Sequence, residues 1–229
     1  MWQETDNNHQ PSNANMTDVV FRINCARLPV DHAAALAQAV CDRAPELKQS
    51  KRAGIHPIHV AGSQNGWERP AHLGDYLLLS KRTRFKIRID VESAASLISS
   101  LSGVTLDVDG SALQIVSGQA RALMPVQTLF TRNLYFEGLD TKIEETMFVE
   151  QVIDQCGLFA FSPTKILCGR EHTVNTPKGP RLTRSVLLAD VPVMQSLQLQ
   201  ENGLGDGRTM GCGIFIPHKD TGAVNEVNG

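Results

Sequence analysis

The chain has 229 residues, of which 41% are hydrophobic and 20% are charged, and its formal net charge is −2. This length suits one large domain or two small ones, each with its own core. No apolar run approaches the roughly 18 residues of a membrane helix, so we expect no membrane partner. The five cysteines are scattered and form no Cys-x-x-Cys pair, which argues against a disulfide framework and a zinc knuckle and favours a reducing, cytoplasmic location.

The net charge is unfavourable for a nucleic-acid binder, because contacts with phosphate need cations. The charge is nevertheless uneven along the chain. Residues 51–88 contain eight Lys or Arg and two Asp or Glu, a local charge of +6. A basic patch on an acidic protein is therefore compatible with the composition.

The first 16 residues are polar and are expected to form a disordered leader. An apolar strand is predicted at 19–23, and Asp31 is placed to cap a helix over 32–43. The elements predicted next, in chain order, are a turn-rich segment with a brief strand (54–66), a strand (76–79), an alternating strand (83–90), a helix (91–101) and a strand pair (104–108 and 113–116).

The second half repeats this order. Its predicted elements are a strand (126–136), a helix (140–156), a hairpin of two strands (165–172 and 181–188) with its tip at 176–180, a helix (194–200) and a closing strand (212–216). Two passes of β-α-β-β-α-β predict an α+β fold of two tandem ferredoxin-like units. We expect them to join near 117–122, with domains at 17–118 and 119–229.

A glycine-rich segment precedes the closing strand and contains five glycines within eleven positions, namely Gly203, Gly205, Gly207, Gly211 and Gly213. Such spacing allows backbone N–H groups to approach a phosphate. Glycines that only provide turn geometry or flexibility are the alternative. The segment does not fit a dinucleotide fingerprint, which follows a strand and opens a helix, because here a helix precedes and a strand follows.

Three segments together carry a resemblance to a known family. They are the glycine-rich segment ending in Gly211-Cys212-Gly213, the run Leu28-Pro29-Val30-Asp31-His32 that opens the first helix, and Gly54-Ile55-His56-Pro57-Ile58 after that helix. In this order the chain resembles the CRISPR-associated repeat-RNA processing endoribonucleases of the RAMP superfamily (the "Cas six" family). The resemblance implies a doubled ferredoxin-like fold and cleavage of repeat RNA into guide RNA without a metal ion.

RNA cleavage without a metal ion needs a base for the ribose 2′-OH and an acid for the departing 5′ oxygen, and histidine suits both roles. The resemblance implies His32, at the start of a helix, and His56, after that helix, as the catalytic pair. His59 lies two residues beyond Pro57 and is a weaker candidate. Because His56-x-x-His59 lacks a second ligand pair at zinc-site spacing, neither a metal nor another cofactor is expected.

Cations for the RNA backbone are expected on the alternating strand, on the hairpin and in the glycine-rich segment. A strand face or hairpin that is merely solvated is the alternative reading of the same charges. The residues predicted to bind RNA are Arg84, Lys86, Arg88, Lys165, Arg170, Arg181, Arg184, Gly203, Gly205, Gly207, Arg208, Gly211 and Gly213. Few aromatic residues are present, so recognition by shape and backbone is expected rather than broad base stacking.

The resemblance therefore implies a metal-independent endoribonuclease that leaves a 2′,3′-cyclic phosphate on CRISPR repeat RNA. The expected partners are a repeat RNA, as a stem-loop, and other CRISPR effector subunits. Two alternatives remain open: a non-catalytic RNA-binding RAMP subunit of an effector complex, and a ferredoxin-like domain that binds a small ligand or a protein.

Overall fold

The computed structural model describes residues 14–60, 75–139 and 144–218. Most of the expected leader, the second half of the turn-rich segment and the first turn of the helix expected at 140–156 lie outside these ranges. The described residues form an α+β fold of two larger antiparallel sheets and a two-stranded ribbon, which confirms the predicted class. None of the described helices is long and apolar enough to span a membrane.

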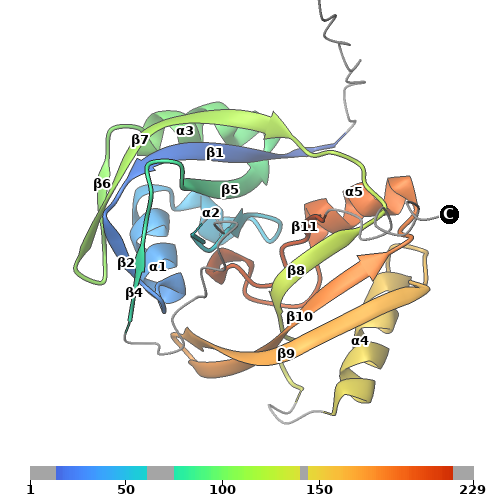
Figure 1. Cartoon of the computed structure of the whole chain (residues 1–229). Helices are drawn as coiled ribbons and strands as arrows, with labels where there is room; N and C mark the ends of the chain where they lie inside the picture. Colours follow the sequence, from blue (N-terminus) through green and yellow to red (C-terminus); the bar gives the residue numbers. More distant parts are fainter. Residues whose placement is uncertain (1–13, 61–74, 140–143, 219–229) are drawn as a thin grey trace, which may run out of the picture.

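The first sheet has the strand order β3-β5-β1-β7-β6 (Figure 1). Its strands are β1 (Met16–Asn24), β3 (Gly54–Ile55), β5 (Arg84–Asp90), β6 (Thr105–Val108) and β7 (Ser111–Ala122). One face is covered by helices α1 (Ala33–Arg43), α2 (Glu46–Gln49) and α3 (Ala94–Leu101), the last preceded by the 3₁₀ turn η1 (Val91–Ser93). Phe21, Phe85 and Ile87 are fully buried in the core that these helices share with the sheet.

The second sheet has the order β11-β8-β10-β9. Its strands are β8 (Leu129–Leu134), β9 (Lys165–Thr176), β10 (Gly179–Ala189) and β11 (Ile216–Pro217). Helices α4 (Glu145–Gly157) and α5 (Val193–Asn202) accompany it, and the 3₁₀ turn η2 (Arg208–Met210) lies between α5 and β11. A separate core that includes Leu134, Val152 and Phe215 holds these elements together.

Four of the differences between the observed and the predicted elements bear on the candidate site. The strand expected at 76–79 is β4 (Tyr76–Leu78), but it pairs with β2 (Arg27–Pro29) in the ribbon and not with a larger sheet. Strand β7 continues to Ala122 and so runs through the boundary predicted between residues 118 and 119. The closing strand is only Ile216–Pro217, because the residues before it belong to the glycine-rich segment. Finally, His32 and not Asp31 is the N-cap of α1, and the Asp31 carboxylate instead accepts a hydrogen bond from Asn175.

Candidate functional site

His32 is buried at the start of α1, with 1% of its surface exposed. Its Nδ1 lies 2.7 Å from the carbonyl oxygen of Pro29, and its Nε2 accepts a hydrogen bond of 3.0 Å from the N–H of Ile58. Because an N–H can only donate and a carbonyl can only accept, the ring proton must be on Nδ1 and the imidazole must be neutral. His32 therefore fastens the segment after β3 to the first turn of α1.

His56 lies on that same segment and is also buried. Its backbone N–H donates to the carbonyl of Lys86 on β5, and its Nε2 lies 3.5 Å from Oδ1 of Asp18. Burial lowers the pKa of His56, and the Asp18 carboxylate only partly opposes this shift. The structure thus brings His32 and His56 into one region but exposes neither reactive nitrogen, while His59 on the same segment is half-buried.

Arg88 is the largest fully buried side chain of the described residues. Its Nε and Nη2 donate to the two carboxylate oxygens of Asp18, at 2.7 and 3.0 Å. Burial would raise the pKa of Asp18, but the guanidinium of Arg88 and the ring of His56 outweigh that effect and hold the pKa well below its usual range. Asp18 and Arg88 are therefore a charged pair inside the protein.

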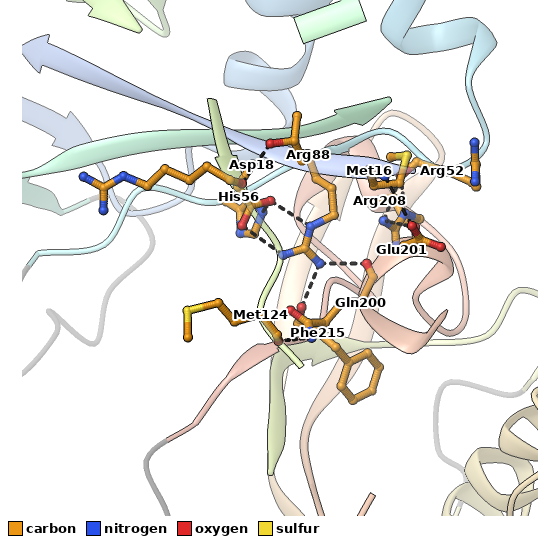
Figure 2. A network of polar contacts seen from close by, with 12 residues as sticks. Met16, Asp18, Arg52, His56, Arg88, Met124, Gln200, Glu201, Arg208 and Phe215 are labelled. Atoms are coloured by element: carbon orange, nitrogen blue, oxygen red, sulfur yellow. Dashed lines mark hydrogen bonds and ion pairs between the residues drawn. The ribbon is translucent and has the colours of Figure 1, made fainter. Parts of the chain in front are cut away.

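The same guanidinium joins the first sheet to the end of the chain. Its Nη1 donates to the carbonyls of Gln200 and Phe215, both at 2.8 Å, as Figure 2 shows. Arg88 is fully buried in this structure, so its guanidinium is not presented to an RNA backbone, and the contact with phosphate that the sequence suggested stays a prediction. Arg84, Lys86 and Arg88 do share a face of β5, but α5 and the glycine-rich segment cover the Arg88 end of it.

Arg208 makes a second connection of the same kind. Its guanidinium donates to the carbonyls of Arg52 (2.7 Å), Glu201 (3.1 Å) and Gly213 (3.4 Å). Burial lowers the pKa of Arg208 to about 9, with a further contribution from the Arg88 cation. Arg208 was expected to meet phosphate, but its donors are directed at backbone oxygens inside the protein (Figure 2).

The glycine-rich segment is tightly folded upon itself. All five of its glycines have φ between +63° and +78°. A Cβ at Gly205 would collide with the carbonyl of Tyr135, and a Cβ at Gly213 would collide with the carbonyl of Leu204. Several N–H groups of the segment are also engaged internally, including that of Gly213 with the carbonyl of Asn133 at 2.7 Å. The turn-geometry alternative therefore accounts for these glycines, Gly203, Gly207 and Gly211 included.

The β9–β10 hairpin carries basic residues whose charges are largely compensated. Arg184 pairs with Glu145 and Glu171, at 3.4 and 2.8 Å. Arg181 and Lys178 both pair with Glu137, and Lys165 pairs with Asp190. Arg170 is exposed and forms no ion pair with a described residue. A hairpin neutralised in this way attracts phosphate less strongly than its basic residues alone suggest.

A different cationic surface lies on the first sheet, on the face opposite the helices. Arg22 is paired in register with Arg84, and Asp18 lies between Arg88 and Arg121 on the neighbouring strands, so these side chains share one face. The exposed cations of this face, Arg22, Arg84, Lys86 and Arg121, are named here the sheet patch; none of them forms an ion pair with a described residue. Arg22 and Arg121 were not among the residues predicted to bind RNA, although the alternation of β1 and β7 could have placed them beside Arg84 and Lys86.

Comparisons with known proteins agree with this architecture. The family model described as Cas6 Crispr matches residues 17–220. A relative from Myxococcus xanthus (strain DK1622), named CRISPR-associated endonuclease Cas6, is 27% identical over 203 residues, which are 87% of this chain and 80% of the relative.

Three solved structures share the fold at low sequence identity. "CRISPR associated protein Cas6" has a TM-score of 0.64 at 10% identity and covers 89% of this chain and 100% of its own. "An RAMP protein binding different RNA substrates" has a TM-score of 0.61 at 10% identity and covers 87% and 98%. Cse3 of Thermus thermophilus, described as bound to an RNA representing a pre-cleavage complex, has a TM-score of 0.50 at 12% identity and covers 88% and 98%.

The fold and these matches define a CRISPR-associated protein with a RAMP-like fold. Because the family model covers nearly the whole chain, the protein belongs to the Cas6 family of endoribonucleases. This confirms the resemblance drawn from the glycine-rich segment and the two histidine-containing runs.

The buried Arg88 pair predicts an unequal response to two alanine substitutions on one strand. Arg88→Ala should lower the free energy of unfolding by about 3–5 kcal/mol, because Asp18 is left as an uncompensated buried charge. Arg84→Ala, four residues earlier on the exposed part of the same strand face, should change the free energy of unfolding by no more than about 0.5 kcal/mol. Urea unfolding of both variants measures the difference, and equal losses would contradict the structural role of Arg88.

The glycine-rich segment predicts that close packing adds to backbone strain. Gly110 and Gly213 both have positive φ, +75° and +65°, but only Gly213 is packed against a carbonyl. Gly110→Ala should cost about 1 kcal/mol from φ alone. Gly213→Ala should cost roughly 1–3 kcal/mol more, because the added methyl group meets backbone that cannot rotate away. Equal losses in chemical denaturation would show that φ alone matters.

Proposed function

We propose that this chain is an endoribonuclease that cuts CRISPR repeat RNA to produce guide RNA. The observation that carries the proposal is the match of the Cas6 family model over residues 17–220. Two further findings support it: the M. xanthus relative is named an endonuclease, and the Thermus neighbour is described as bound to RNA. A repeat RNA with a stem-loop is the proposed substrate, and other CRISPR effector subunits are the proposed protein partners.

The proposed reaction is an attack of the ribose 2′-OH on the adjacent phosphate, which releases the 5′ oxygen and leaves a 2′,3′-cyclic phosphate. A base takes the 2′-OH proton, an acid gives a proton to the leaving oxygen, and no metal ion takes part. Histidine provides both proton transfers near neutral pH. Three histidines, His32, His56 and His59, lie in the region where α1 meets the segment after β3.

The structure favours different roles for these histidines. Both ring nitrogens of His32 are engaged, and Nε2 of His56 is buried, so each could reach RNA only if the segment after β3 moved away from α1. The proposal therefore assigns proton transfer first to half-buried His59, and a positioning role to His32 and His56. Direct catalysis by His32 and His56, as the family resemblance implies, is the alternative that mutation distinguishes.

The proposed surface for the RNA backbone is the sheet patch. Its four cations have no carboxylate partners among the described residues, whereas most hairpin cations do. Phosphate binding by uncompensated cations releases counterions without first breaking an ion pair. The hairpin, through exposed Arg170, is the second proposed contact. The proposal gives Arg88, Arg208 and the five loop glycines structural roles instead.

The two larger sheets are proposed to correspond to two ferredoxin-like units. Read as β1-α1-β3-β5-α3-β7 and β8-α4-β9-β10-α5-β11, both have the order β-α-β-β-α-β and equivalent strand arrangements in their sheets. Their joint is proposed to follow Ala122, where β7 ends, rather than residue 118.

The proposed function predicts cleavage without a divalent ion. The protein should cut the repeat RNA of its own CRISPR array once per repeat in excess EDTA, and mass spectrometry of the 5′ fragment should detect a 2′,3′-cyclic phosphate. His59→Ala should slow single-turnover cleavage by roughly 10²- to 10⁴-fold with unchanged RNA affinity, the usual contribution of general acid–base catalysis. His32→Ala should lower the melting temperature instead, because Ile58 and Pro29 lose their partner.

His172→Ala is the matched control, since His172 is an exposed histidine on β9 outside this segment. A large rate loss in His32→Ala or His56→Ala at unchanged melting temperature would reinstate those residues as the catalytic pair. RNA binding without any cleavage by the wild-type chain would favour the non-catalytic RNA-binding alternative, and no binding at low salt would favour a ligand- or protein-binding domain.

The sheet patch predicts the salt dependence of RNA binding. The double substitution Arg84→Ala with Lys86→Ala should reduce the slope of log affinity against log salt by about 0.7 for each lost contact with single-stranded RNA. Arg181→Ala with Arg184→Ala removes the same charge from the compensated hairpin, so the two variants differ only in which surface they change. Equal slopes in filter binding would mean that the sheet patch is merely solvated.

A further inference from the structure

Tyr135 follows β8 and lies against the glycine-rich segment. Its carbonyl accepts a hydrogen bond of 3.1 Å from the N–H of Asp206, and its ring covers Gly207 so closely that a Cβ there would lie 2.7 Å from the tyrosine hydroxyl. Only 7% of the residue is exposed. The ring therefore closes one side of the segment, and the absence of a side chain at Gly207 makes room for it.

Elements from both halves of the chain meet at this ring. Tyr135 forms a small buried cluster with Val174 of β9 and Cys212 of the glycine-rich segment, and Ala33 of α1 packs against it. Ala33 directly follows His32, and His32 binds the segment that carries His59. Tyr135 thus lies beside the start of α1, the region to which the proposed function assigns proton transfer.

The hydroxyl of Tyr135 forms no hydrogen bond with any residue that the structure describes. Within the described ranges, three side-chain atoms are fully buried and have no hydrogen-bond partner: His56 Nε2, Thr83 Oγ1 and Gln200 Oε1. The hydroxyl oxygen of Tyr135 also lacks a partner but is not in this group, because it is not fully buried. Water therefore reaches it although the ring is buried. Buried tyrosines usually direct the hydroxyl to a partner, so this group is open to a ligand.

The surroundings keep this hydroxyl protonated. Burial raises the pKa of Tyr135 to about 12, with contributions from Cys212 and Glu137. At neutral pH the group can donate a hydrogen bond but is not a base. The charge of Glu137 is itself compensated by Arg181, at 3.2 Å, and by Lys178, at 3.6 Å. The carboxylate of Asp206, which also raises this pKa, accepts a hydrogen bond from the N–H of Glu137.

We propose that Tyr135 is a substrate-contacting residue whose hydroxyl donates a hydrogen bond to a backbone oxygen of RNA bound beside the start of α1. The proposal rests on the proposed function and names one contact of that site. The acceptor is an oxygen of either a phosphate or a ribose, and both belong to the same strand. The ring holds the glycine-rich segment and the hydroxyl contacts the substrate, so the two parts of the side chain have separable roles.

Tyr135→Phe separates these roles because it keeps the ring and removes the hydroxyl. We expect an unchanged melting temperature and a loss of RNA affinity or single-turnover cleavage of about 10-fold, the scale of one hydrogen bond to a polar or charged group. Tyr135→Ala should also lower the melting temperature, because Gly207 loses the ring that covers it. Tyr76→Phe is the matched control: Tyr76 is the only other tyrosine of the chain, and it is exposed on β4.

Repeat RNAs with single 2′-deoxy substitutions identify the acceptor. If Tyr135 contacts a ribose, one deoxy position should weaken wild-type binding but not weaken Tyr135→Phe further. If it contacts a phosphate, every deoxy effect should be the same in both proteins, while Tyr135→Phe alone remains weak. A Tyr135→Phe protein within twofold of an active wild type overturns the contact and leaves the proposed function standing. A wild type that neither binds nor cuts the RNA overturns both.

Discussion

The bidentate pair between Asp18 and Arg88 is the interaction on which the arrangement of this molecule depends. Burying a guanidinium and a carboxylate costs several kcal/mol for each ion, which their attraction offsets only when geometry and hydrogen bonding are nearly complete. Here four bonds satisfy Arg88, two to Asp18 and two to the carbonyls of Gln200 and Phe215. The two carbonyls cannot be replaced by water inside the protein, so the first sheet and the end of the chain must pack together for the pair to be stable.

This requirement explains why the glycine-rich segment is compact. Arg208 donates to carbonyls on both sides, that of Arg52 before β3, that of Glu201 at the end of α5 and that of Gly213 in the segment itself. Residues 200–215 are consequently fastened at several points, and backbone passes close to backbone, which only glycine permits at Gly205 and Gly213. The same packing brings Tyr135 and Cys212 against Ala33. The candidate site therefore exists only when the two halves are docked.

Local patterns in the sequence correctly indicated which side chains share a strand face and the order of the elements along the chain. They could not show which distant segments pack on those faces. Alternation in β5 correctly placed Arg84, Lys86 and Arg88 on one face, yet it could not show that α5 and a segment more than 110 residues away would bury Arg88. The glycines were correctly read as a special backbone, but their use was decided by contacts with Tyr135 and Leu204. Asp31 is a residue type that is preferred at an N-cap, but its carboxylate accepts a hydrogen bond from Asn175 on β9, a partner far away in the sequence, and does not cap α1.

Charge pairing gives the final constraint on where RNA could bind. The chain has 22 basic and 24 acidic residues, so its cations can serve a polyanion only where carboxylates are kept away. The hairpin arginines form ion pairs with Glu137, Glu145 and Glu171. An approaching phosphate would have to displace these carboxylates. On the first sheet the carboxylate of Asp18, which is paired in register with Arg121, is already bound by Arg88 on both oxygens. The buried pair that joins the two halves thus also removes the acid that would otherwise neutralise Arg121 and Lys86, and it leaves the sheet patch positive on a protein whose net charge is negative.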